Sequence, residues 1–215
     1  MKKILFIAIF SICSLSYGQL TEGYFQYSII VTPQDSSVET LQKTGLMFDS
    51  KMELYFTKYQ SRLNFVMGTS NTNSIIVDQK KKIGLSLTSN PKGSYAVQLF
   101  EKDLVYNTKA NDTSIKVKFL ADKSVILGFN CKKAILTQGN AETTYWYTDE
   151  IKLDQSNQMI MNPNIPGFPL YFSTIADNMK MEYKASNYKY KVENPEEVFS
   201  LIIPQGYQII YQGQK

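Results

Sequence analysis

The sequence of 215 residues contains no histidine and only two cysteines, Cys13 and Cys131. Without histidine it has no Ser-His-Asp triad, no histidine general base and no histidine-based zinc site. A catalytic cysteine normally needs a base such as histidine to supply its thiolate, so Cys131 is interpreted as a buried cysteine in a strand. The sequence therefore predicts a protein that is not an enzyme and that uses no metal or cofactor.

Clustered positive charge is scarce as well. Lysine and arginine together number 23 against 19 acidic residues, and the sole arginine is Arg62. The densest basic patch, Lys80–Lys82, lies between two apolar segments and is typical of a solvated hairpin turn. Because phosphate binding relies on clustered basic side chains, the sequence predicts no nucleic-acid partner.

Long apolar runs are absent too, and the N-terminal run Ile4–Leu15 is too short to span a membrane. It has about a dozen residues, whereas a transmembrane helix needs about twenty. Lys2 and Lys3 precede it as the positive region of a secretory signal peptide. A lipoprotein signal would place a small residue before its cysteine, and Ile12 before Cys13 does not fit that pattern.

Small residues follow the apolar run, as a signal-peptide cleavage site requires. Ser16 and Gly18 stand at the −3 and −1 positions before Gln19. We therefore expect residues 1–18 to be a cleaved signal peptide and residues 19–215 to form a single β domain, without a transmembrane segment. The mature protein is expected in the periplasm, at the cell surface or outside the cell.

The dominant pattern of the mature chain is alternation of apolar and polar residues, which is typical of strands with one buried face. It is clearest in three segments: 25–31, 115–119 and 179–185. Further strand-like segments are 53–57, 62–67, 74–78, 83–88, 95–100, 132–137, 143–148 and 198–203. Short helices are allowed only at 40–49 and 195–199. Many short strands with few helices predict a mainly β fold built on an antiparallel sheet, which can be a sandwich, a barrel or a curved half-barrel. Of these we predict a single, strongly curved sheet or half-barrel.

An ordered set of motifs covers about the C-terminal 90 residues. Ile126–Ala134 has the pattern Gly-aromatic-x-Cys-Lys-Lys-Ala, Tyr145–Ile151 has Trp-Tyr-Thr-x-Glu-Ile, and Asn164–Leu170 contains Pro-Gly. The closing segment Ile203–Tyr207 has Pro-x-Gly-Tyr. In this order the motifs resemble the GLPGLI family of exported Bacteroidetes proteins and a related exported domain of unknown function.

The resemblance has one clear departure. The Gly-Leu-Pro-Gly-Leu-Ile that names the family is replaced here by Asn164-Ile165-Pro166-Gly167-Phe168-Pro169, which keeps only the central Pro-Gly. The resemblance implies export and a mainly β fold similar to the curved sheet of bacterial lipoprotein carriers. It supplies no catalytic residues that can be carried over.

Trp146 and Tyr147 are candidate ligand-binding residues, because aromatic rings combine a large apolar area with a polar group. In an alternating strand Trp146 points away from Tyr145 and Tyr147, so that one of these two sides faces the core. A core position for Trp146 is the alternative to a ligand contact.

The segment from Pro166 to Leu170 is the most distinctive loop motif. Pro166 and Pro169 stiffen the backbone and Gly167 permits a sharp turn, so that Phe168 and Leu170 are candidates for the apolar rim of a ligand cavity. In the alternative interpretation, Phe168 folds back and plugs the end of the sheet.

Two functional hypotheses follow from these residues. In the first, the protein is a binding module of the cell envelope that holds an apolar ligand, such as a lipid or acyl chain, without covalent chemistry. In the second, the core is filled and an exposed edge or loop docks an envelope protein. A cavity of a few hundred cubic ångströms would favour the first, and an exposed apolar patch the second.

Overall fold

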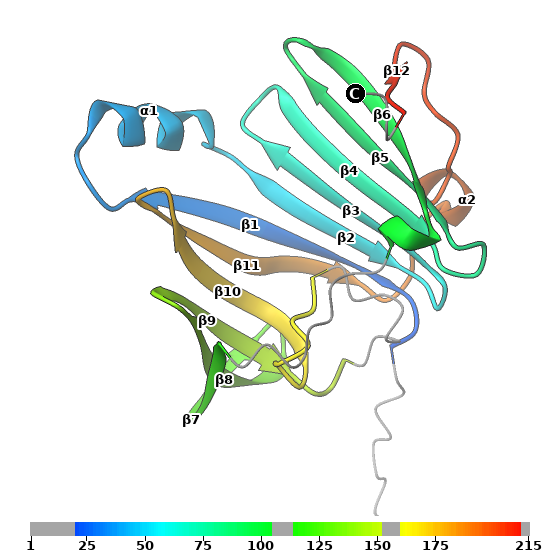
Figure 1. Cartoon of the computed structure of the whole chain (residues 1–215). Coiled ribbons are helices and arrows are strands. Elements are labelled where there is room, and N and C mark those ends of the chain that lie inside the picture. The colour runs from blue at the N-terminus through cyan, green and yellow to red at the C-terminus, as the bar shows by residue number, and fades with distance from the viewer. Residues whose placement is uncertain (1–19, 105–113, 152–159, 212–215) are drawn as a thin grey trace, which may run out of the picture.

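The computed structural model describes residues 20–104, 114–151 and 160–211. The predicted signal peptide, residues 1–18, lies outside this part of the chain. The described residues form one 12-stranded sheet that is strongly curved and does not close (Figure 1). The predicted fold class, a mainly β protein with a single curved antiparallel sheet and few short helices, is confirmed.

The sheet has the strand order β12-β6-β5-β4-β3-β2-β1-β11-β10-β9-β8-β7. The strands are β1 (Gly23–Pro33), β2 (Lys51–Phe56), β3 (Gln60–Met67), β4 (Asn71–Asp78), β5 (Ile83–Asn90), β6 (Gly93–Phe100), β7 (Ile115–Ile126), β8 (Phe129–Gln138), β9 (Ala141–Thr148), β10 (Phe168–Ala176), β11 (Met179–Lys189) and β12 (Gln208–Ile209). All neighbouring pairs are antiparallel except β12 and β6, which form a short parallel pair. Strand β1 therefore joins the two halves of the sheet, because it pairs with β2 on one side and with β11 on the other.

Two strand predictions need correction. Residues 198–203 pair with no strand; Val198 ends a short helix, and Leu201 and Ile203 pack against the sheet. Residues 168–176, expected to begin as a loop, form β10. Pro169 lacks an N–H, and the structure tolerates it because the register of β10 against β9 shifts between Pro169 and Tyr171.

One face of the sheet carries the main core. The alternate residues of β1 and β2 are buried here, and they pack against Ile151 and the start of β10. The buried members are Phe25, Tyr27, Ile29, Met52, Leu54, Phe56, Leu63, Cys131, Ile151, Phe168, Leu170 and Ala185. Tyr27 donates a hydrogen bond of 2.7 Å from its hydroxyl to the carbonyl oxygen of Pro169, which ties β1 to β10. Burial raises the pKa of Tyr27 well above its usual value, so this hydroxyl stays protonated.

The opposite face of the sheet is covered at its β4–β6 end. The buried side chains there are Ile76, Leu85, Leu87 and Ala96, and Leu201, Ile203 and Tyr207 of the C-terminal segment pack on them. This segment follows the short helix α2 (Pro195–Val198) and ends near the pairing of β12 with β6 (Figure 1). The C-terminal segment therefore covers the apolar side chains of this face at the β4–β6 end.

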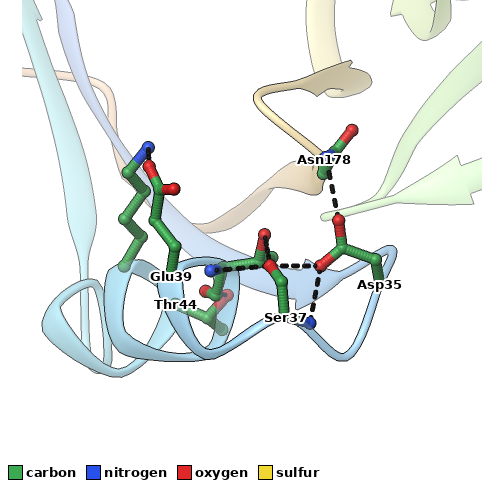
Figure 2. Close-up of polar contacts among 7 residues, drawn as sticks. Asp35, Ser37, Glu39, Thr44 and Asn178 are labelled. Atoms are coloured by element: carbon green, nitrogen blue, oxygen red, sulfur yellow. Dashed lines mark hydrogen bonds and ion pairs between the residues drawn. The ribbon is translucent and has the colours of Figure 1, made fainter.

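The other helices are α1 (Val38–Leu46) and the 3-10 turn η1 (Glu101–Asp103). Figure 2 shows how the start of α1 is held. Ser37 caps the helix by accepting a hydrogen bond of 3.2 Å from the N–H of Thr40, and Asp35 accepts bonds from Ser37 and, at 2.8 Å, from the side chain of Asn178. The bonds from Ser37 lower the pKa of Asp35. Since Asn178 lies in the turn between β10 and β11, α1 is fixed against the central strands.

Candidate functional site

The predicted loop residues lie at the start of β10, against the end of β9. Phe168 and Leu170 have no exposed surface, and the ring of Phe168 lies 4.7 Å from that of Phe25, centre to centre. A Cβ atom on Gly167 would come within 2.5 Å of the carbonyl oxygen of Thr148, so this position needs glycine for close backbone approach. In this arrangement Phe168 is a core residue at the start of β10.

The predicted aromatic candidates lie on opposite faces of β9. Tyr147 is buried with Ala134 and Ile165 in a small cluster beside the main core. Trp146 is partly buried, packs against the edge of the main core and also lines two hollows of the surface. Of the candidate residues, Trp146 is therefore the one that reaches a described hollow.

The sheet register sets the neighbours of Trp146. Trp146 pairs with Lys133 of β8 on one side and with Tyr171 of β10 on the other, and Tyr171 in turn pairs with Lys184 of β11. Lys184 pairs with Ser28 of β1. Directly paired residues share one face, so a row that crosses five strands places two aromatic rings between two lysines. Neighbouring strands lie about 4.8 Å apart, so the row is about 19 Å long.

The first of the two hollows is mostly apolar and has a volume of about 720 Å³. We call it the apolar hollow; it is lined by Ser28, Ile30, Ser124, Val125, Ile126, Leu127, Trp146, Tyr171, Lys184, Ala185 and Ser186. Its floor comes from β1, β11, β10 and β9, and its wall is the end of β7 with the turn into β8. Ile30 is 54% exposed and Val125 is 66% exposed, so apolar surface is open to solvent here.

The second hollow lies on the other side of the two rings and has a volume of about 320 Å³. We call it the polar hollow; it is lined by Lys133, Glu142, Thr144, Trp146, Tyr171, Ser173, Thr174, Ile175 and Lys180. Trp146 and Tyr171 line both hollows, so the hollows meet at these side chains. We refer to the two hollows together as the groove.

Charges around the groove are only partly neutralised. Tyr171 donates a hydrogen bond of 2.5 Å from its hydroxyl to Glu182, and Lys180 lies 3.1 Å from the same carboxylate. The bond from Tyr171 is the main reason that the pKa of Glu182 is lowered, so this carboxylate is ionised at neutral pH. The ammonium of Lys133 lies 5.6 Å from the ring centre of Trp146. Within the described residues, neither Lys133 nor Lys184 forms an ion pair.

Two further hollows contain Cys131 and Arg62. One of about 330 Å³ contains Cys131, but burial raises the pKa of its thiol to about 11, so the thiol is protonated at neutral pH. The other, of about 410 Å³, contains Arg62, whose guanidinium donates to Asn64 and to the carbonyl oxygen of Val198. Arg62 thus ties the chain at the end of α2 to the sheet.

The described residues include no cluster of histidine, cysteine or acidic side chains able to hold a metal ion. In the same part of the chain, no helix has the length and apolar character needed to cross a membrane.

Several groove residues were not predicted from the sequence. Tyr171 and Lys184 belong to the hairpin of β10 and β11, and Ile30 belongs to β1, which is distant from that hairpin in sequence but adjacent to β11 in the sheet. Alternation alone indicates which side of its own strand each residue occupies. The sequence did not show that the segment 25–31 pairs with the segment 179–185. This pairing, together with those of β11 with β10 and of β10 with β9, puts Ile30 and Lys184 on the same face as Trp146.

No family model matches the chain, and no curated protein matches its sequence. Among solved structures, PNGF-II in a C2 crystal form is 13% identical, with a TM-score of 0.49 over 89% of this chain and 31% of PNGF-II. MucB in complex with MucA(peri) is 10% identical, with a TM-score of 0.42 over 87% of this chain and 57% of MucB. LprF from Mycobacterium bovis is 13% identical, with a TM-score of 0.37 over 86% of this chain and 90% of LprF. The chain thus spans about a third of PNGF-II and somewhat more than half of MucB.

Proposed function

We propose that this protein is a non-catalytic binding module of the cell envelope, exported by its N-terminal segment, and that it holds the apolar part of a lipid-like ligand in the groove. The observation that carries the proposal is the apolar hollow of about 720 Å³, because its volume is typical of sites for small organic ligands. Its exposed apolar side chains stand on paired strands, which keep the site formed before the ligand arrives.

The burial of Phe168 and Leu170 directs the proposal to this groove. Phe168 and Leu170 pack inside the main core and are not available at a rim. Trp146 keeps its candidate role on the other face, and Tyr171 joins it. Ligand binding would bury the exposed parts of Ile30 and Val125, which supplies favourable free energy in proportion to the apolar area removed from water.

Tryptophan fluorescence tests the proposal directly, because Trp146 is the sole tryptophan of the sequence and lines the groove. Titrating the purified protein with the fatty acid palmitate, below its micelle concentration, should change the emission of Trp146 in a saturable manner. Val125→Asp should weaken binding at least tenfold. Ile202→Asp, at a residue that is 81% exposed and lies outside the groove, is the matched control and should bind as the unchanged protein does. A titration without saturable change, together with no retention of palmitate in equilibrium dialysis, would refute the proposal.

A second candidate function is the docking of an envelope protein on α1. Apolar side chains of this helix and of the residues after it face solvent, with Phe48 81% and Leu46 73% exposed. The hydrogen bonds at its start hold the helix in place, which suits a fixed contact surface. If this candidate is right, a protein that cross-links to the unchanged chain in envelope extracts is lost with the double variant Leu46→Asp, Phe48→Asp, while palmitate binding stays unchanged.

A further inference from the structure

The two hollows of the groove differ in chemistry although they share two aromatic side chains. Beyond Trp146 and Tyr171, the side chains of the apolar hollow are mainly aliphatic, from Ile30 and the stretch Val125–Leu127. The side chains of the polar hollow are mainly hydroxyls, ammonium groups and a carboxylate. A ligand that lies across both rings would therefore meet apolar surface at one end and polar surface at the other.

One ammonium of the polar hollow, that of Lys133, is available to an anion. The hollow is lined by Lys133 and Lys180 against Glu142, but Lys180 is already paired with Glu182, 3.1 Å away. Glu142 is exposed on β9, whereas Lys133 is partly buried and held against the ring of Trp146. Since Lys133 has no carboxylate partner within the described residues, an anion is the group that would complete its interactions.

Hydroxyl groups surround the same position. Thr144 pairs with Ser173 across β9 and β10, directly beside the pair formed by Trp146 and Tyr171. Thr174 also borders this hollow, but it pairs with Thr143 on the other face of the sheet and is not counted as a donor here. The hydroxyls of Thr144 and Ser173 near one ammonium suit the oxygens of a carboxylate or phosphate ester, because each oxygen accepts more than one hydrogen bond.

We infer that the polar hollow is a headgroup site, and that the ligand of the groove is a single-chain amphiphile with an anionic oxygen headgroup held by Lys133. This inference rests on the proposed function and specifies its ligand. The chain would run from Lys133 across the faces of Trp146 and Tyr171 to Ile30 and the wall of the apolar hollow. Lys184 lies on the other side of the two rings from Lys133, among the residues of the apolar hollow, and would contribute mainly through its aliphatic stem.

The test compares three ligands of equal chain length, with Trp146 emission and equilibrium dialysis as readouts. Palmitate carries a carboxylate, a one-chain palmitoyl lysophospholipid with a glycerol headgroup carries a phosphodiester, and monopalmitoylglycerol is uncharged. Binding of the charged ligands should be about ten- to a hundredfold tighter than that of the uncharged one, as expected for a charge-assisted hydrogen bond. A difference between palmitate and the lysophospholipid identifies free fatty acid or phospholipid as the source of the anion.

Lysine variants locate the headgroup. Lys133→Gln should remove the preference for charged ligands and leave the affinity for monopalmitoylglycerol within about twofold. Lys184→Gln should change the preference much less, and Lys92→Gln, in the turn between β5 and β6, is a matched control outside the groove.

The outcomes separate the two proposals. If none of the three ligands binds, the proposed function itself fails. If all three bind equally well and Lys133→Gln changes nothing, the groove binds apolar chains and the headgroup inference is overturned. The inference is equally overturned if Lys184→Gln, rather than Lys133→Gln, abolishes the preference.

Discussion

Replacing Phe168 with alanine tests whether this residue belongs to the core or to a ligand site. Phe168 has no exposed surface, and its ring lies 4.7 Å from that of Phe25. Truncating a buried phenylalanine removes its apolar contacts and leaves a cavity, at a cost of about 3–5 kcal/mol in the free energy of unfolding. At an exposed rim the same change would cost roughly 0.5 kcal/mol or less.

The cavity left by Phe168→Ala is expected to remain largely open. Phe25 also contacts Phe56, at 6.4 Å between ring centres, and Tyr188, at 5.7 Å. Its position is thus fixed by several aromatic neighbours and by its place in the central strand β1, so that it cannot move far to fill the space. The loss should therefore lie in the upper part of the range, at about 4 kcal/mol.

Urea unfolding followed by the fluorescence of Trp146 measures this loss. With a slope of about 2 kcal/mol per molar urea, a loss of about 4 kcal/mol lowers the midpoint by about 2 M. Phe48→Ala is the matched control, because Phe48 is 81% exposed and its removal should shift the midpoint by less than about 0.3 M. A loss below about 1 kcal/mol for Phe168→Ala would show that the assignment of this residue to the core is wrong.

Three further predictions concern other contacts. Gly167→Ala should cost about 1–3 kcal/mol in an unfolding titration, because the added Cβ would meet the carbonyl oxygen of Thr148 at 2.5 Å; an unchanged midpoint would contradict the close approach. Ser37→Ala should cost about 1 kcal/mol, since it removes the cap of α1, whereas Ser37→Thr, which keeps the hydroxyl, should retain most of the stability. Cys131 should react with a thiol reagent only slowly near neutral pH in the folded protein and rapidly in urea, because burial raises its pKa from 9.0 to about 11; fast reaction of the folded protein would argue against burial of this thiol.

The pKa of Cys131 also predicts how stability depends on pH. The raised pKa means that the folded protein retains the thiol proton while the unfolded chain loses it near 9.0. The unfolded state therefore binds fewer protons between 9.0 and about 11, and stability falls as the pH rises through this window. Cys131→Ala should remove the part of this fall in the free energy of unfolding that is due to the thiol. Urea titrations at a series of alkaline pH values would detect the difference.

Alternation in the sequence predicted most strands because nearly every strand has one buried face. Residues 25–31 and 179–185 are the clearest cases, and they are paired with each other as β1 and β11 in the structure. The turn at Lys80–Lys82 is confirmed between β4 and β5, where Lys82 adopts a positive φ of 56°. Short-range patterns of this kind depend only on neighbours in the chain, so one sequence is enough to find them.

Two strand predictions, for residues 198–203 and for β10, were wrong. Residues 201–203 are as apolar as a strand, but Leu201 and Ile203 cover Ile76 and its neighbours instead of joining the sheet. The strand β10 was missed because Pro169 and the register shift after it interrupt the usual pattern at its start. In the first case the deciding contacts come from residues far away in sequence, and in the second from a proline and a register shift, which an alternation pattern does not represent.

The position of the groove follows from how the second face of the sheet is covered. At the β4–β6 end, the C-terminal segment packs on the apolar residues of this face and buries them. Further along the same face, at β1, β11, β10 and β9, no described segment packs on the sheet in this way. Ile30 therefore stays 54% exposed beside Trp146 and Tyr171. Exposed apolar surface on rigid strands is costly in water and is a common property of binding sites. The groove is therefore the part of this face at which a ligand can supply the cover that the chain itself supplies at the other end.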